Sequence, residues 1–561
     1  MRTALKITVI ILAMVIVLPL LTVAGLYFTA MHSFKEPDIS VQLSDCRPTI
    51  WNDSLRICGN NYLLLNQHGL WEARIEGSPV ERGAVMGLLS KDILQHQEHV
   101  FVEQIHRIIP SERYIRFLHK LIAIFNRNMP RYIPVEYLEE ICALSLSCSS
   151  EYNDYGTPYA RQLNYHAAHD IGHTMQEYML VGCSSFAAWG EDSADGGLIV
   201  GRNFDFYVGD EFAENKIVLF VNPDAGYKFV SVTWPGMTGV VSGMNEQGLT
   251  VTINAAKGAV PTSSAMPISL LARHMLQYAK SIDEALCIAD SCQTFVSESL
   301  LIGSANDGCA AIIEKTPDET HLYSSDSAHV ICTNHYQSRY FADNKYNVEN
   351  IASSDSKYRY DRLSELTECN IPLNPHKSAG ILRNRFGLNN EDIGLANEKS
   401  INQFIAHHAV IFQPQERKIW VSTSPWQCGA FLCYDMDEIF AGGAARKSMA
   451  RQSEQIAADT SFMEHEYARI VEFRRQTAEL QLAISRDTVV PEGFVDRYID
   501  NNPHHYLVYD LAGDYALTRD DAAGAVSYWK NALTKEIPHM SYRNNIEKKI
   551  KRYDKKQRPA L

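Results

Sequence analysis

The pattern of apolar and polar positions divides the chain into three parts. From residue 32 to about residue 181, apolar residues recur at helical spacing, as in 92–125 and 135–141. From residue 183 to about residue 443, short apolar runs rich in β-branched residues alternate with Gly, Asn and Asp, as strands and turns do. Helical spacing returns beyond about residue 444. The pattern therefore predicts a helical part, a β-rich part and a second helical part, in that order.

The β-rich part carries the most specific predictions. The expected strands are 197–200, 217–221, 229–232, 249–253, 300–302 and 310–313, the expected helices are 267–279 and 281–290, and a hairpin is expected over 410–421. Strands followed by helices and then by further strands predict an α+β fold.

A stretch without charged side chains lies near the start of the chain. Residues 7–30 hold no Asp, Glu, Lys or Arg and follow Arg2 and Lys6. A helix of this length spans the ~30 Å hydrocarbon layer, and residues 29–32 make a poor signal-peptidase site, so an uncleaved transmembrane anchor is expected within 1–30. Basic residues precede the stretch, so the positive-inside rule places the rest of the chain on the periplasmic or extracytoplasmic side.

Composition limits the classes of function. The chain has 561 residues and a formal net charge of −14, which predicts two or three domains and argues against broad nucleic-acid binding. In an oxidising compartment its 12 cysteines would either form local disulfides or remain buried thiols. The local pairs expected from spacing are Cys46–Cys58, Cys142–Cys148, Cys287–Cys292 and Cys428–Cys433. No double CxxC pattern predicts a zinc site, and no metal or cofactor is expected.

The strongest chemical signal is the segment Gly182-Cys183-Ser184-Ser185-Phe186. A thiol placed after glycine can attack the carbonyl group of its own preceding peptide bond. Once that bond breaks, Cys183 carries both a nucleophile and an α-amino group, whose pKa of ~7.7–8.0 suits a base that works near neutral pH. The motif therefore predicts self-cleavage between Gly182 and Cys183.

Polar residues then recur at the ends of the β-rich runs. They occur in Gly201-Arg202-Asn203-Phe204-Asp205-Phe206, Gly243–Leu249, Asn254, Thr333-Asn334-His335-Tyr336 and Tyr358-Arg359-Tyr360. This set and its order, over residues 182–436, resemble the N-terminal-nucleophile (Ntn) hydrolases of the penicillin acyltransferase (acyl-coenzyme A:6-aminopenicillanic acid acyltransferase) and choloylglycine hydrolase type. The resemblance implies a four-layer αββα sandwich, which agrees with the α+β pattern.

The resemblance also implies roles for individual residues. Arg202 and Asp205 match the pair that serves the nucleophile, since a guanidinium favours the thiolate and a carboxylate orients the free amine. Asn254 and Asn334 stand where the family has its oxyanion donors. Arg359 matches a late arginine that holds this network together, and Arg362 is the competing choice.

One departure from the family concerns substrate choice. Choloylglycine hydrolases usually carry an aromatic residue and a proline where this chain has Ala255-Ala256. Together with the long segment before Cys183, this difference argues against bile-salt specificity.

Two regions flank the predicted catalytic part, 183–443. Segment 31–182 is expected to stay associated after cleavage as a helical, α-chain-like subunit. In 444–561, Tyr509, Gly513, Ala525, Trp529 and Ala532 match the spacing of one tetratricopeptide (TPR) repeat, so these helices either pack against the catalytic part or offer a groove to a protein partner.

A histidine cluster lies just before the predicted cleavage point. His166, His169 and His173 fall on one face of an expected helix. A polar helix face near the junction, where a histidine can assist proton transfer, is favoured over metal ligation.

These observations predict a membrane-anchored, self-processing cysteine Ntn hydrolase or acyltransferase. It would cleave or transfer the acyl group of a linear, non-peptide amide, for example a lipid-like acyl amide, through a thioester on Cys183. The alternatives are an ester hydrolase similar to phospholipase B-like proteins and a non-catalytic scaffold that presents the TPR-like helices to a partner.

Self-cleavage predicts that the mature protein consists of two pieces, residues 1–182 and 183–561. N-terminal sequencing of the larger piece is expected to begin Cys-Ser-Ser-Phe. Cys183→Ala removes the attacking sulfur, so intact mass is expected to show one full-length, inactive chain. An active protein in which Cys183 is still joined to Gly182 contradicts the amine base.

Overall fold

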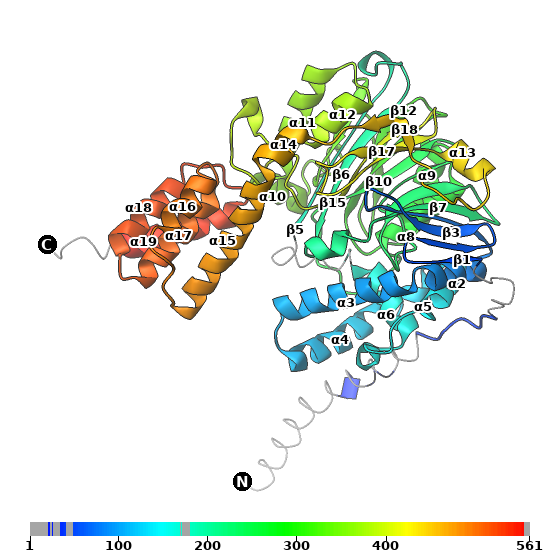
Figure 1. Cartoon of the computed structure of the whole chain (residues 1–561), viewed down its shortest axis with the longest axis horizontal. Coiled ribbons are helices and arrows are strands. Elements are labelled where there is room, and N and C mark those ends of the chain that lie inside the picture. The colour runs from blue at the N-terminus through cyan, green and yellow to red at the C-terminus, as the bar shows by residue number, and fades with distance from the viewer. Residues whose placement is uncertain are drawn as a thin grey trace, which may run out of the picture.

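The computed structural model describes residues 21, 22, 25, 28, 34–40, 49–168, 170 and 180–554. Two β-sheets form the centre of this part of the chain, and helices lie around them (Figure 1). In spatial order, the 11-stranded sheet consists of β1 (Ile50–Trp51), β2 (Leu55–Cys58), β3 (Asn61–Leu65), β4 (Trp71–Gly77), β7 (Ile217–Pro223), β8 (Phe229–Thr233), β9 (Ser242–Asn245), β10 (Leu249–Ala255), β11 (Glu298–Ser304), β12 (Cys309–Lys315) and β13 (Thr320–Tyr323). The 7-stranded sheet consists of β14 (His329–Cys332), β5 (Leu180–Ala188), β6 (Ile199–Tyr207), β15 (Ala406–Gln413), β16 (Lys418–Ser422), β17 (Phe431–Asp435) and β18 (Arg451–Ile456).

Apolar clusters define the layers. One cluster lies between the sheets, where Val200 and Val410 of the smaller sheet meet Val218 and Leu301 of the larger. Helices α8 (Ile268–Tyr278) and α9 (Ile282–Ser291) pack on the outer face of the larger sheet, while α11 (Ser356–Asn370) and α12 (Pro375–Leu382) pack on the outer face of the smaller. Two further helices, α10 (Lys345–Ser353) and α13 (Met436–Ala441), complete this part.

The mixed helix and sheet composition confirms the α+β class. The expected strands lie within β6, β7, β8, β10, β11 and β12, the expected helices are α8 and α9, and the expected hairpin is formed by β15 and β16. The order helix, sheet, sheet, helix is the arrangement that the family resemblance implies.

The part before Cys183 is not only helical, so the predicted helical segment is incomplete. Its helices are α2 (Pro79–Leu89), α3 (Lys91–Ile108), α4 (Glu112–Asn126), α5 (Val135–Ser145) and α6 (Pro158–His166). It also supplies β1–β4 to the larger sheet, where β4 pairs in parallel with β7 along its whole length. The turn Gly59-Asn60, with Gly59 at φ 60°, joins β2 to β3 and is the hairpin signal that the helical pattern overshadowed. Because the β4–β7 ladder joins residues on both sides of position 182, cutting the chain there would not separate the two parts.

A buried ion cluster strengthens the same connection. Glu140 of α5 accepts hydrogen bonds from Arg82 of α2 (2.7 Å) and from Arg273 of α8 (2.6 Å). Both arginines are 1% exposed. Burial opposes ionisation of Glu140, but the guanidinium groups of Arg273 and Arg82 outweigh it and lower the pKa of Glu140 to about 2. The carboxylate thus remains charged at neutral pH between the helices and the sheets.

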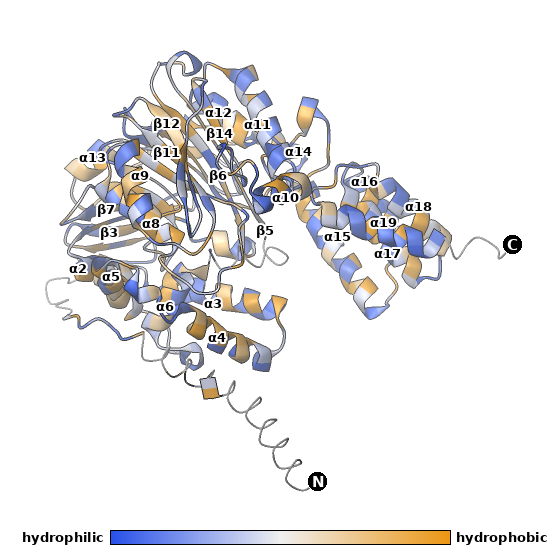
Figure 2. Ribbon diagram, turned by 180° about the vertical axis from the view of Figure 1, so that it is seen from behind, coloured by the Kyte–Doolittle hydropathy of each residue, from blue (hydrophilic) through white to orange (hydrophobic). Residues whose placement is uncertain are grey.

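The C-terminal helices form a lobe beside the sheets (Figures 1 and 2). They are α14 (Thr460–His465), α15 (Tyr467–Arg486), α16 (Phe494–Asn501), α17 (Tyr506–Thr518), α18 (Ala522–Ala532) and α19 (Met540–Asp554). Helices α17 and α18 pack closely, and a Cβ on Gly513 would lie 2.4 Å from Nε1 of Trp529. Arg474 of α15 pairs with Asp210 at 3.1 Å and donates to the carbonyl group of Phe404. The lobe therefore packs against the β-rich part, and no contact in the described ranges supports a groove for a protein partner.

The predicted single-pass membrane localisation is corrected by the structure. Across the ranges described above, no helix combines the length and the apolar character needed to cross a bilayer. Most of the predicted anchor, within residues 1–30, lies outside the described residues.

Three of the four expected cysteine pairs are wrong. Their six thiols, Cys142, Cys148, Cys287, Cys292, Cys428 and Cys433, are free. Their side chains have other partners: Cys428 accepts from Asn402 at 3.3 Å, whereas Cys433 lies in the apolar cluster beneath α11 and α12. Cys58 is disulfide-bonded, and Cys46 lies outside the described residues.

We expect Glu140→Gln to destabilise the continuous Cys183→Ala chain by about 3–5 kcal/mol, because two buried guanidinium groups lose their counterion. Thermal unfolding at pH 7 measures this loss. The matched control is Glu112→Gln, which removes an exposed i,i+4 pair with Arg116 and is expected to leave stability nearly unchanged. Equal effects of the two substitutions would contradict the role of the cluster.

Candidate active site

Gly182 and Cys183 lie inside β5 rather than at a boundary before the β-rich part. β5 runs between β14 and β6, and Cys183 is 1% exposed. In the β5–β6 register, Gly182 lies opposite Asp205 and Ser185 lies opposite Arg202. Because successive side chains of a strand point to opposite faces, Cys183 and Arg202 share one face of the sheet, whereas Asp205 lies on the other.

Arg202 is held beside the thiol of Cys183. Its Nη2 lies 3.5 Å from Sγ of Cys183, and its Nη1 donates to the carbonyl of Val241 at 2.7 Å. It also donates to the hydroxyl group of Ser242 and to the carbonyl of Ile253. Burial raises the pKa of the Cys183 thiol, and the guanidinium only partly opposes this. The thiol is therefore protonated near neutral pH in the continuous chain and needs a base.

Asn334 and Arg359 hold the backbone of Cys183. Oδ1 of Asn334 accepts from the N–H of Cys183 at 3.0 Å and from Nη2 of Arg359 at 2.7 Å. Arg359 donates through Nη1 to the carbonyl of Cys183 at 2.7 Å and through Nε to Asp355 at 3.0 Å. The competing Arg362 instead contacts Asn384 and Glu365, away from Cys183. Of the two arginines, Arg359 is thus the one that contacts Cys183.

The two asparagines expected to stabilise an oxyanion have other partners in the continuous chain. Nδ2 of Asn334 donates to the carbonyl of Ala255 at 2.8 Å. Nδ2 of Asn254 donates to the carbonyl of Cys332 at 3.1 Å, and its Oδ1 accepts from Ser185 at 3.0 Å. Both asparagines therefore lie at the site, but the atom that Asn334 presents to Cys183 is an acceptor, Oδ1, while its donor is used by Ala255.

Asp205 is a buried carboxyl group without a hydrogen-bond partner. It is 0% exposed, and neither of its oxygens has a partner within the part of the chain that the structure describes. Burial raises the pKa of Asp205 to about 8, although Arg359 and Arg202 act in the opposite direction. The residue opposite Gly182 is thus a largely neutral acid that lacks a cation to bind.

Several residues at the site carry no signal in the sequence. Asp355 anchors Arg359 through a hydrogen bond, and the charge of Glu298, the first residue of β11, adds to the rise in the pKa of Cys183 that burial causes. Gln403 lies against Gly182, where a Cβ would come within 2.7 Å of its Nε2. In the sequence, Glu298 is an ordinary residue at the start of a strand and Gln403 is an ordinary loop residue. Only the folded sheets bring them close to β5.

Of the three histidines in the predicted cluster, His166 lies within the described residues, and its ring has other partners. His166 is buried, its Nδ1 contacts the carbonyl of Gln162 at 2.8 Å, and its Nε2 accepts from the N–H of Thr238 at 3.0 Å. Both ring nitrogens are therefore occupied, and burial lowers the pKa of His166 to about 4. His169 and His173 lie outside the described residues.

Residues 191–424 match the family model described as acyl-coenzyme A:6-aminopenicillanic acid acyl-transferase, which confirms the resemblance. An uncharacterized protein of Archaeoglobus fulgidus is 25% identical over 333 residues, which cover 53% of this chain and 55% of that protein. Protein dcd1B of Dictyostelium discoideum is 24% identical over 270 residues, which cover 45% of this chain and 51% of that protein. The matched region thus spans about half the length of these curated relatives.

Two solved structures are also similar to part of the chain. One is the Caenorhabditis elegans ortholog of N-acylethanolamine-hydrolyzing acid amidase, with 14% identity, a TM-score of 0.31, and coverage of 41% of this chain and 93% of that one. The other is a mutant of conjugated bile acid hydrolase from Clostridium perfringens, with 12% identity, a TM-score of 0.31, and coverage of 46% and 93%.

The raised pKa of Asp205 predicts how the stability of the continuous chain changes with pH. The folded chain keeps this proton up to about pH 8, whereas the unfolded chain loses it near its ordinary value of 3.8. Stability is therefore lost as pH rises between these two values. We expect Cys183→Ala/Asp205→Asn to melt at the same temperature as Cys183→Ala near pH 4 and several degrees higher near pH 8. A melting difference that does not grow with pH would contradict this assignment.

Proposed function

Because residues 191–424 match the acyl-coenzyme A:6-aminopenicillanic acid acyl-transferase family, we propose that this chain is a self-processing Ntn hydrolase or acyltransferase that acts on amide bonds through Cys183. The observation that carries the proposal is the buried, unpartnered carboxyl group of Asp205 opposite Gly182. A free, protonated α-amino group on Cys183 would be a cation close enough to pair with the carboxylate of Asp205 on the neighbouring strand.

Activation begins with the thiol of Cys183 and the carbonyl carbon of Gly182. The S–C bond forms, the C–N bond to Cys183 breaks, and the thiol proton ends on the departing nitrogen, which leaves a thioester and a free amine. Water then hydrolyses the thioester and gives the carboxylate of Gly182 and the restored thiol of Cys183. The new amine remains next to Oδ1 of Asn334, which already accepts from this nitrogen in the continuous chain.

The mature cycle uses the same two groups of Cys183. The amine takes the thiol proton, the thiolate attacks the substrate carbonyl, and the protonated amine returns the proton to the leaving nitrogen. Arg202 favours the thiolate, while Asp205 and Asn334 orient the amine. The acyl group then passes from the thioester to water or to an acceptor amine.

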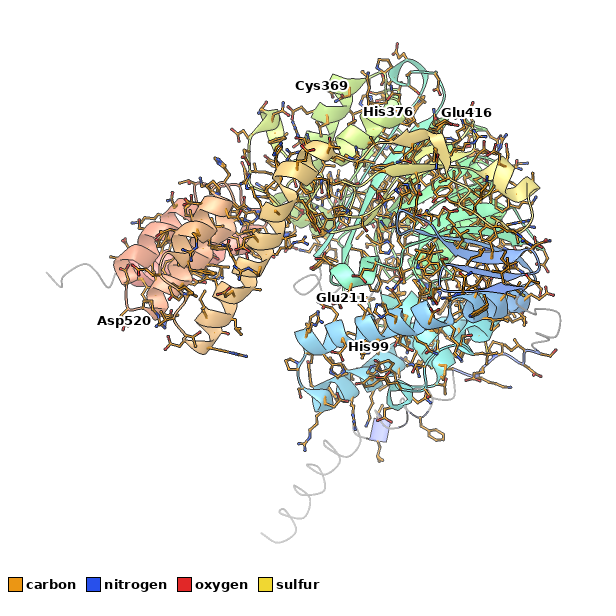
Figure 3. The ribbon with its side chains drawn as sticks, viewed as in Figure 1. His99, Glu211, Cys369, His376, Glu416 and Asp520 are labelled. Carbon is orange, nitrogen blue, oxygen red and sulfur yellow. The ribbon has the colours of Figure 1, made fainter. Side chains whose placement is uncertain are left out.

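A pocket next to β6 is lined mostly by apolar side chains. Phe206, Phe212 and Trp234 line it from the β-rich part, and Leu94 and Phe101 of α3 line it from the helices. The 3₁₀ helix η5 (Asp210–Ala213), labelled at Glu211 in Figure 3, lies close to α3, labelled at His99, and Gln97 donates to the carbonyl of Phe212 at 3.0 Å.

This pocket is connected to the nucleophile through aromatic contacts. Phe206 stacks on Phe204 at 5.6 Å, and Phe204 lies opposite Cys183 in the sheet. We assign the acyl chain of a linear, non-peptide amide to this pocket. Most of its lining is aromatic or aliphatic, which favours a lipid-like acyl group over a charged one.

Asp205→Asn is expected to lower amide turnover per cleaved chain by about 10²–10⁴-fold, because the amine loses the carboxylate that orients it. In the uncleavable Cys183→Ala background, thermal melting at pH 7 is expected not to fall, since a buried acid without a hydrogen-bond partner in the described structure is replaced. The measurement is turnover of a fluorogenic acyl amide, normalised to the amount of N-terminal Cys183.

The control is Asp361→Asn, which changes an exposed carboxylate paired with Lys357 on α11. It is expected to leave both cleavage and turnover within about twofold, as surface pairs contribute little. Normal turnover of Asp205→Asn would remove Asp205 from the mechanism, and release of alcohol but not amine from matched substrates would favour an ester hydrolase.

A further inference from the structure

Gln403 lies against the peptide bond that the proposed self-cleavage breaks. It is 3% exposed, and its Nε2 has no acceptor among the residues that the structure describes. A Cβ built on Gly182 would lie 2.7 Å from Nε2 and 3.4 Å from Oε1 of Gln403. A buried N–H donor without an acceptor is destabilising, so a residue of this kind beside Gly182 needs a functional reason.

The two sides of the β5 backbone have different occupants. Gln403 lies where the side chain of residue 182 would point, and the thiol of Cys183 lies on the opposite face because strand side chains alternate. Peptide planes lie roughly in the plane of a sheet, so a thiol that attacks the carbonyl carbon of Gly182 from one face pushes the carbonyl oxygen toward the other. The oxygen that gains negative charge therefore moves toward the face that holds Gln403.

We propose that Gln403 is the side-chain oxyanion donor of self-cleavage, through Nε2–H to the carbonyl oxygen of Gly182. This inference rests on the self-cleavage proposed above. As the S–C bond forms, the π electrons of the carbonyl group move to the oxygen, where Nε2–H stabilises the charge. As the C–N bond breaks, those electrons return and the thiol proton passes to the nitrogen.

In the continuous chain, the two asparagines expected to be oxyanion donors already donate to other groups. Nδ2 of Asn254 and Nδ2 of Asn334 both donate to main-chain carbonyl groups, at 3.1 Å and 2.8 Å. Nε2 of Gln403 is not committed to an acceptor in the described ranges, so it can respond when charge appears on Gly182.

Local hydrogen bonds fix the backbone on both sides of Gln403. Asn402 accepts from the N–H of Phe404 at 3.0 Å, and its own carbonyl accepts from Ser400 at 2.7 Å. Phe404 adopts φ 55°, which is uncommon for a residue with a side chain, and Arg474 of the C-terminal lobe donates to its carbonyl. A donor carried on a backbone held in this way needs less reorganisation during the reaction.

The test follows conversion of the newly made full chain into its two pieces by pulse-labelling and gel separation. Gln403→Met keeps the length of the side chain but removes the N–H groups, and is expected to slow cleavage at least tenfold, since a single oxyanion donor contributes ~10²–10³ in rate. In the uncleavable Cys183→Ala background, the melting temperature is expected to change little. This combination separates a donor from a residue that only packs.

The matched control is Gln427→Met. Gln427 is another buried glutamine with an unpartnered Oε1 in the described structure, but it donates to Leu382 and does not contact Gly182. The Gln427→Met chain is expected to cleave at the normal rate, even if its melting temperature is lower than that of the unsubstituted chain. Gln403→Glu, which replaces the donor with an acceptor when ionised, is expected to cleave progressively more slowly as pH rises.

The outcomes separate this inference from the proposed function. Cleavage of Gln403→Met and Gln403→Glu at the normal rate overturns the donor role and leaves self-processing intact. A normal chain that is active but never cut overturns self-processing itself. If Gln403→Met slows cleavage and also clearly lowers the melting temperature in the Cys183→Ala background, the donor role is overturned and Gln403 is a packing residue.

Discussion

A buried carboxyl group without a counterion is the constraint around which this site is arranged. Asp205 lies opposite Gly182 in the sheet and is fully buried, and its raised pKa shows that the fold holds it as an acid. A peptide nitrogen cannot compensate a carboxylate, whereas an ammonium group can. Breaking the bond between Gly182 and Cys183 would therefore give the carboxylate of Asp205 an ammonium partner. The same amine would then serve as the catalytic base.

The surrounding architecture keeps the nucleophile in place through such a change. Arg359 contacts the carbonyl of Cys183 and Oδ1 of Asn334, so one guanidinium from α11 holds both sides of the residue on β5. The larger sheet joins β4 to β7, and Glu140 links α5 to α8, which ties the part before Cys183 to the part after it. The C-terminal lobe completes the frame through Arg474, which meets Asp210 after β6 and Phe404 before β15.

Much of the fold and the identities of the expected site residues could be predicted from the sequence. Strand and helix periods found α8, α9 and most strands after Cys183. These elements are apolar runs of ordinary length, and turn residues such as Gly, Asn and Asp separate them. The order of Cys183, Arg202, Asp205, Asn254, Asn334 and Arg359 matched a family, and the structure brings all six to one region. The strands β1–β4 were missed because helical spacing dominates that segment, although Gly59-Asn60 marks their hairpin.

Other features depend on tertiary contacts that no local pattern carries. Gln403 reaches Gly182 only because β15 lies beside β6, and the donors of Asn254 and Asn334 turn toward main-chain carbonyls that come from other strands. Cysteine spacing failed for a similar reason at Cys428 and Cys433, which are near in sequence but lie in different apolar clusters. The apolar stretch in 7–30 was interpreted from hydropathy alone, and the described helices do not support a membrane span.

A crystal structure of the active enzyme, purified without substitution, tests the central claim most directly. The account predicts a chain break between Gly182 and Cys183, with the amine of Cys183 within hydrogen-bond distance of both a carboxylate oxygen of Asp205 and Oδ1 of Asn334. An active enzyme with a continuous chain at this position, or a cleaved enzyme in which Asp205 still has no partner, would contradict it.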